Sequence, residues 1–175
     1  MNTYQIIAPE RLDATVNLPA SKSISNRALV IHALAGERIV PDNLSDCDDT
    51  EVLVAALAHL PHTIDIKAAG TAMRFITAYL AVAGAGEYVV TGTERMRHRP
   101  IGALVEALRM MGADISYVEQ EGFPPLRIQG HRLLGGRLEV PGNISSQYIS
   151  ALLLIGPVME RGLELHLTGT IVSRP

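Results

Sequence analysis

Tryptophan is absent from this chain of 175 residues, and aromatic side chains make up only 4% of it. A surface that stacks nucleic-acid bases is therefore not expected, and the net charge of −3 gives no general attraction for a polyanion. Cysteine occurs once, at Cys47, which excludes a disulfide within the chain and fits a reducing compartment. Gly156 and Pro157 interrupt the longest apolar run, and residues 1–9 lack the features of a secretory signal. We expect a cytoplasmic protein that binds neither nucleic acid nor membrane.

Sequence patterns for common cofactors and metals are also missing. Neither GxxxxGK(S/T) nor GxGxxG is present, so no nucleotide cofactor is expected. His59 and His62 flank Pro61, which keeps the two imidazoles from sharing one helical face and argues against a zinc pair. The acidic run 42–51 lacks the glycine and the spaced glutamate of a calcium loop, so it is better explained as the start of a helix. We therefore expect no metal and no cofactor.

The segment 19–27, PASKSISNR, is the most informative feature that is present. It brings three hydroxyl groups, an amide and the cations Lys22 and Arg27 into a loop that leads into an apolar helix. The start of a helix offers unpaired N–H donors and partial positive charge. Serines alone would indicate ordinary capping, but their combination with two cations predicts a site for a phosphate or a carboxylate.

A strand, a loop of small residues and a helix that begins near Ser or Thr follow one another three times. The expected strands are 14–18, 64–67 and 138–140, the loops are 19–27, 68–74 and 141–147, and the helices end near residues 35, 83 and 154. Further helices are expected after Asp49 and from Pro100 to Met111, and further strands at 87–91, 115–119, 126–129 and 163–168. The pattern predicts an α+β fold of repeated βαβαββ units, whose equivalent loops gather at one end.

Several side chains in these loops are candidates for binding an anion. Gly70 lets a ligand approach the backbone, and Arg99 precedes a helix start, where a cation is unfavourable unless an anion joins it. Arg74 is equally compatible with a structural ion pair and with ligand binding. For Arg95 and Arg97 we favour a solvated strand edge. Polar groups that fit a phosphate or a sugar-like hydroxyl follow the third strand, at Ser145, Ser146 and Gln147, although either serine alone would also serve as a helix cap.

Four segments resemble the 5-enolpyruvylshikimate-3-phosphate synthase family, in the family's order: SKSISNR at 21–27, GTAMR at 70–74, RMRHRPI at 95–101 and SSQYISALL at 145–153. The resemblance implies two domains of three βαβαββ units each, with the active site between them. It implies transfer of the enolpyruvyl group of phosphoenolpyruvate to the 5-hydroxyl of shikimate 3-phosphate, through a tetrahedral ketal and with release of phosphate.

The resemblance also assigns substrates to individual residues. Shikimate 3-phosphate would contact Lys22, Ser23, Arg27, Ser145, Ser146, Gln147 and Ser173, and phosphoenolpyruvate would contact Lys22, Gly70, Arg99 and Gln147. The chain departs from the family at Lys67 and Ala68, where the family has Gly-Asn, and at Phe75, where it has proline. These changes border the phosphoenolpyruvate site, so the response to glyphosate does not carry over.

Family members are more than twice as long as this chain. We therefore expect an N-terminal fragment with roughly two and a half units: residues 1–18 are a strand segment of the other domain, and 19–175 are an incomplete first domain. The acid/base carboxylate would lie in the missing half, so the chain alone is expected to be inactive and its parent to be a monomer. Two alternatives remain: an enzyme resembling UDP-N-acetylglucosamine enolpyruvyl transferase, and a non-catalytic anion-binding module.

Overall fold

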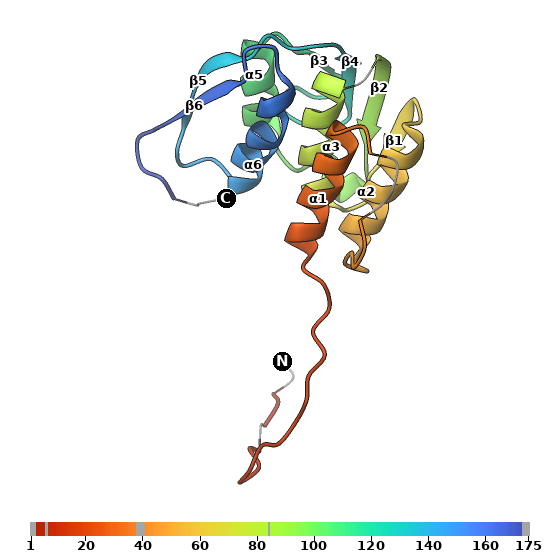
Figure 1. Cartoon of the computed structure of the whole chain (residues 1–175), viewed down its shortest axis with the longest axis vertical. Coiled ribbons are helices and arrows are strands. Elements are labelled where there is room, and N and C mark those ends of the chain that lie inside the picture. Colours follow the sequence, from red (N-terminus) through yellow and green to blue (C-terminus); the bar gives the residue numbers. More distant parts are fainter. Residues whose placement is uncertain (1–2, 6, 38–40, 84, 173–175) are drawn as a thin grey trace.

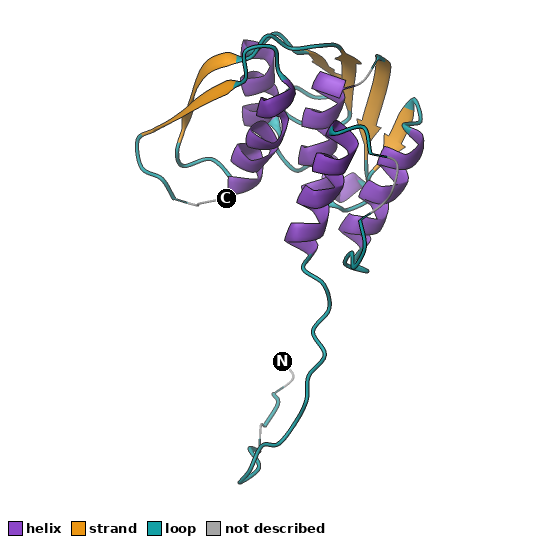
Figure 2. Cartoon of the chain, in the orientation of Figure 1, coloured by secondary structure: helices purple, strands orange, loops and turns teal. Residues whose placement is uncertain are grey.

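The computed structural model describes residues 3–5, 7–37, 41–83 and 85–172. Helices and strands alternate along most of this length (Figures 1 and 2). In chain order the elements are α1 (Lys22–Leu34), α2 (Asp48–His59), β1 (Thr63–Asp65), α3 (Gly70–Ala83), β2 (Gly86–Thr91), α4 (Glu94–Arg97), α5 (Gly102–Met110), β3 (Asp114–Tyr117), β4 (Leu126–Gly130), β5 (Gly136–Pro141), α6 (Ser146–Ile155), the 3-10 turn η1 (Gly156–Val158) and β6 (Leu163–Thr168).

The middle repeat is a complete βαβαββ unit. It runs β1, α3, β2, α5, β3, β4, with the short α4 inserted before α5. Its four strands form one sheet in the order β1-β2-β4-β3, in which β1 and β2 are parallel and the other pairs are antiparallel. Parallel strands need a crossover connection, and α3 supplies it. The α+β class and the order of elements predicted for this unit are confirmed.

The other two repeats are present in part. β5, α6 and β6 form a parallel pair with its crossover helix, as predicted for the third repeat. The first repeat contributes α1 and α2, but the predicted strand at 14–18 is not formed. Residues 7–19 are exposed, and the chain there extends away from the helices (Figure 1). A strand needs a neighbour for its N–H and C=O groups, and none of the described residues pairs with this segment.

Helix α3 lies at the centre of the folded part. Its residues 70–81 are buried without interruption, and it packs against α1, α2, α6 and the sheet. Apart from Arg74, the sequence GTAMRFITAYLAVA is largely apolar or small around the helix, which is typical of a helix with no solvent face. Because the helix is enclosed, its first turn has a fixed position relative to the surrounding elements.

Helix α5 buries the residues that the spacing predicted. Leu104, Val105 and Leu108 are fully buried, and the flanking Ile101 and Met111 are buried too. The helix begins at Gly102 with Ile101 as its N-cap, so Pro100 precedes the helix instead of opening it. Gly112 follows the end with a φ of 96°, a left-handed conformation that glycine adopts at little cost.

Two helices begin earlier than the sequence indicated. α1 starts at Lys22 and α3 at Gly70, so most of the predicted loops 19–27 and 68–74 is helical. Ser21 caps α1, since its Oγ accepts a hydrogen bond of 3.4 Å from Ile24 N. The predicted strand edge around Arg95 is also wrong, because residues 94–97 form the short helix α4. Within the described ranges, no helix is both long and apolar enough to cross a membrane.

Candidate functional site

The starts of α1, α3 and α6 meet at one place, as the repeat predicted. Asp49, at the start of α2, joins the first two: its Oδ2 lies 3.8 Å from Lys22 Nζ, and its Oδ1 accepts a hydrogen bond of 3.2 Å from Thr71 N. Gln147 of α6 donates through Nε2 to Thr71 Oγ1 at 3.3 Å. Three helix N-termini and a lysine therefore face a common region whose donors suit an anion, and the Asp49 carboxylate already occupies one of these donors and offsets part of the positive charge.

Arg27 links α1 to α6 and α3. Its Nη1 donates to Ser23 O at 3.0 Å, and its Nη2 donates to Ser150 Oγ at 3.0 Å. The Phe75 ring lies beneath the guanidinium, with 5.8 Å between Cζ and the ring centroid. Ser150 was not among the predicted site residues. It lies four residues after Ser146, and this helical spacing was the available signal for a shared face.

Arg99 and Gly70 are in close contact. A β-carbon at position 70 would lie 2.9 Å from Arg99 Cζ and would collide with its guanidinium nitrogens. Only glycine leaves room for the arginine to lie against the first turn of α3. Arg99 also lines a cavity of about 460 Å³ together with Ala68, Arg95 and Met96. The structure thus brings together the two residues that the sequence assigned to one substrate.

Arg74 has a structural role that the sequence did not indicate. It is 5% exposed, and its guanidinium donates to Gly70 O at 2.9 Å and to Pro100 O at 3.2 Å. Tyr148 donates to the same Pro100 carbonyl at 2.6 Å. Burial lowers the pKa of Arg74 below its usual value. Among the described residues Arg74 binds backbone carbonyls and has no carboxylate partner, so the ion pair considered for it is not formed there.

The remaining candidates have the following places in the described structure, with one exception. Ser145 caps α6, since its Oγ accepts from Gln147 N at 3.3 Å, and Ser146 is the first residue of that helix. Arg97 pairs with Glu119, with 3.0 Å between Nη1 and Oε1. Ser173 lies outside the described residues.

Lys67 adopts a conformation in which glycine is usual. Its φ is 54°, in the left-handed region, at a position where the resembling family has glycine. Asp65 compensates by accepting from Lys67 N at 2.9 Å and from Lys67 Nζ at 2.8 Å. The side-chain hydrogen bond from Lys67 lowers the pKa of Asp65 below its ordinary value. The lysine charge is therefore directed at Asp65.

The acidic run behaves as a helix start. Asp48, Asp49 and Glu51 occupy the first turn of α2, where carboxylates interact favourably with the helix dipole. In the part of the chain that the structure describes, no group of three His, Cys, Asp or Glu side chains could hold a metal ion.

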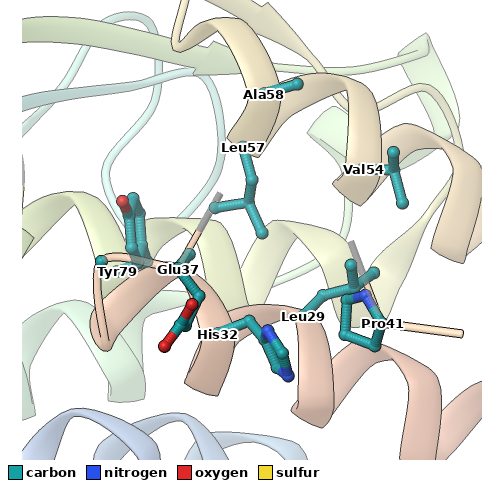
Figure 3. A pocket seen from close by; sticks show the side chains of 10 residues that line it. Leu29, His32, Glu37, Pro41, Val54, Leu57, Ala58 and Tyr79 are labelled. Carbon is teal, nitrogen blue, oxygen red and sulfur yellow. The ribbon is translucent and has the colours of Figure 1, made fainter. Parts of the chain in front are cut away.

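A second hollow lies between α1 and α2, away from the helix starts. Figure 3 shows its walls, with Leu29, Val54 and Leu57 among the apolar side chains and Tyr79 at one side. Among the residues that the structure describes here, the ionisable side chains of this hollow are His32, Glu37 and Tyr79.

One complete βαβαββ unit, parts of two more and the convergence of helix N-termini are the architecture of the enolpyruvyl transferases. Residues 6–66 and 59–175 match the family model described as EPSP synthase (3-phosphoshikimate 1-carboxyvinyltransferase). The chain belongs to the EPSP synthase family.

Relatives agree with this membership. The 3-phosphoshikimate 1-carboxyvinyltransferase of Bacteroides fragilis strain ATCC 25285 is 62% identical over 172 residues, which cover 98% of this chain and 42% of that protein. The enzyme of the same name from Escherichia coli O17:K52:H18 is 42% identical to this chain, and the matched region covers 46% of that enzyme. The EPSP synthase structure from Acinetobacter baumannii matches with a TM-score of 0.69 at 22% identity, over 82% of this chain and 38% of that one, and supports the fold. The chain spans less than half the length of these relatives.

Proposed function

We propose that the chain binds shikimate 3-phosphate and phosphoenolpyruvate and serves the transfer of the enolpyruvyl group to the 5-hydroxyl of shikimate 3-phosphate. The observation that carries the proposal is the meeting of the α1, α3 and α6 starts around Lys22, Thr71 and Gln147. Both substrates are small and multiply anionic, and this region offers helix N-termini with a lysine and arginines nearby. Membership in the EPSP synthase family selects these substrates among the anions that would fit.

The positions of the described residues, which do not include Ser173, support the proposed contacts. Shikimate 3-phosphate would lie along α1 and α6, against Lys22, Ser23, Arg27, Ser145, Ser146 and Gln147, with Ser173 assigned by resemblance alone. Phosphoenolpyruvate would lie against Gly70 and Arg99. Lys22 contacts Asp49, which accepts from Thr71 N, and Gln147 donates to Thr71 Oγ1, so both side chains lie near the start of α3 and suit contacts to both substrates.

The proposed reaction is an addition followed by an elimination. The 5-hydroxyl adds across the C2=C3 double bond of phosphoenolpyruvate: its oxygen bonds to C2 and loses its proton while C3 gains a proton, which gives the tetrahedral ketal. C3 then loses a proton as the bond between C2 and the phosphate oxygen breaks, and phosphate leaves. Lys22 and Arg99 would stabilise the negative charge on the departing phosphate through charge-assisted contacts.

The exposure of the site suggests a division of the active site between this chain and another domain. The Lys22 side chain is 48% exposed, whereas this chemistry gains from excluding water. We propose that residues 19–175 form the half that holds shikimate 3-phosphate, that residues 1–18 pair with another domain, and that this half works in a cytoplasmic, monomeric enzyme. Turnover by the 175-residue chain alone is expected to be absent, and phosphate release at a rate typical of enzymes would contradict this division.

Calorimetric titration of the 175-residue chain tests the binding proposal. We expect saturable binding of shikimate 3-phosphate and much weaker binding of shikimate, because the phosphate makes the charged contacts. Arg27→Gln should weaken binding by about tenfold, as expected for one charge-assisted contact. The control Arg137→Gln removes a guanidinium in β5 that pairs with Glu139 and should leave the affinity unchanged. Absence of saturable binding, or tighter binding of UDP-N-acetylglucosamine, would refute the proposal.

A further inference from the structure

We infer that Arg95 is a second guanidinium ligand for the anionic substrate assigned to Arg99, an inference that rests on the proposed function. The two arginines line the same cavity of about 460 Å³, together with Ala68 and Met96. Ala68 contributes no polar side chain, and Met96 is almost fully buried. The charged groups of this cavity are therefore the two guanidinium groups.

The backbone directs both arginines to one side. Arg95 lies in α4, and the turn continues past its end because Arg99 N donates to Met96 O at 3.0 Å. Arg99 lies beyond the end of α4, and this turn brings it to the same cavity as Arg95. Two guanidinium forks at one cavity can bind different oxygens of one phosphate or carboxylate, or two anionic groups of one molecule.

Arg95 and Arg99 differ from the neighbouring cations, which are paired with carboxylates. Arg97 is paired with Glu119 at 3.0 Å, and Lys67 is paired with Asp65 at 2.8 Å. For Arg95 and Arg99, the described residues provide no carboxylate within 4.0 Å. Two uncompensated positive charges on one cavity raise its potential, and a bound anion would relieve their repulsion.

The segment that carries Arg95 is firmly placed. Met96 anchors it with 1% of its surface exposed, and Thr93 N donates to Lys67 O at 3.0 Å. A β-carbon at Gly92 would lie 2.5 Å from Lys67 O and 3.0 Å from Met96 Cβ, so α4 is packed tightly against the strand–helix connection. The Arg95 backbone is thus held near Ala68 before a ligand arrives, which lowers the ordering cost of binding.

Calorimetry on the 175-residue chain tests this role with three probes, each measured with and without saturating shikimate 3-phosphate. Phosphoenolpyruvate carries both anionic groups, whereas inorganic phosphate and pyruvate carry one each and show which of them Arg95 contacts. Arg95→Gln is expected to raise the Kd for phosphoenolpyruvate about tenfold while leaving the Kd for shikimate 3-phosphate unchanged. Arg95→Lys should recover part of the affinity, because it keeps the charge but loses the fork. The control Arg132→Gln removes an exposed arginine that pairs with Glu160 and should change neither constant.

Three outcomes would overturn the inference: an unchanged Kd for phosphoenolpyruvate in Arg95→Gln, an equal loss for both substrates, or a wild-type chain that binds shikimate 3-phosphate but none of the three probes. A wild-type chain that binds a probe through Arg95 but does not bind shikimate 3-phosphate would refute the proposed function and leave the anion site standing.

Discussion

At the residue scale, one buried cation determines where the exposed cations lie. Arg74 donates to Gly70 O in the first turn of α3 and to Pro100 O in the segment that carries Arg99. Tyr148 adds α6 to the same junction through its hydrogen bond to Pro100 O. Because these acceptors are backbone carbonyls, the junction holds the chain path itself. The contact between Gly70 and Arg99 follows from this arrangement.

Gly70→Ala tests that contact. The new methyl group would collide with the Arg99 guanidinium, and because this is the far end of a flexible side chain, we expect it to move without loss of the fold. The affinity for phosphoenolpyruvate should fall about tenfold, or about 1.4 kcal/mol, as Arg99 leaves its place. Titration of the variant with phosphoenolpyruvate measures this effect.

Gly102→Ala is the matched control for Gly70→Ala. It also places alanine at the first residue of a helix, but its β-carbon would lie 3.5 Å from the nearest atom, Gly122 Cα, an ordinary contact. The affinity for phosphoenolpyruvate should be unchanged in this variant. Equal effects of the two substitutions would show that contact with Arg99 is not the cause.

At the element scale, the sequence predicted elements better than their boundaries. The spacing of apolar residues located α5 and the strands of the middle sheet, because burial of one face depends on residues near in sequence. The starts of α1 and α3 were placed too late, since polar and small residues were interpreted as loop where they fill a first helical turn. The strand expected at 14–18 is not formed in this chain, because a strand needs a neighbouring strand and the expected neighbour belongs to another domain.

The site was predictable to a similar extent. Local patterns indicated Lys22, Arg27, Gly70 and Gln147, and the structure places them around converging helix starts. Asp49 was interpreted as a cap of its own helix, yet its carboxylate accepts from Thr71 N, 22 residues away. Arg27 and Ser150 are 123 residues apart. Such contacts depend on tertiary packing, which no local pattern encodes.

Substitution of two serines that cap helices shows whether a cap stabilises its helix only or also contributes to substrate binding. Ser21 caps α1 through Ile24 N, and Ser145 caps α6 through Gln147 N. Each change to alanine should lower the free energy of unfolding by about 0.5–1 kcal/mol, measured by urea denaturation. Ser145→Ala should in addition weaken binding of shikimate 3-phosphate, whereas Ser21→Ala should not. Equal affinities in the two variants would remove Ser145 from the proposed site.

At the scale of the whole molecule, the folded part is independent of the segment before α1. Residues 7–19 are exposed and contain neither helix nor strand, and the core of α3 and its neighbours lies beyond them. Removal of residues 1–18 should therefore change the free energy of unfolding by less than about 0.5 kcal/mol, as for surface changes that remove no contact. A clear loss of stability in thermal denaturation would show that the segment packs on this part of the chain.

The central position of α3 also has a consequence for the thermodynamics of recognition. The wall formed by Gly70 and Thr71 belongs to the most enclosed helix, so its donors are immobile before any substrate arrives. The wall formed by Lys22 and Ser23 belongs to the exposed start of α1, which follows an extended segment. Binding should therefore lose little conformational entropy on one side of the substrate and considerably more on the other. A substrate would therefore contact a rigid surface on the α3 side and, on the α1 side, a surface that becomes ordered on binding.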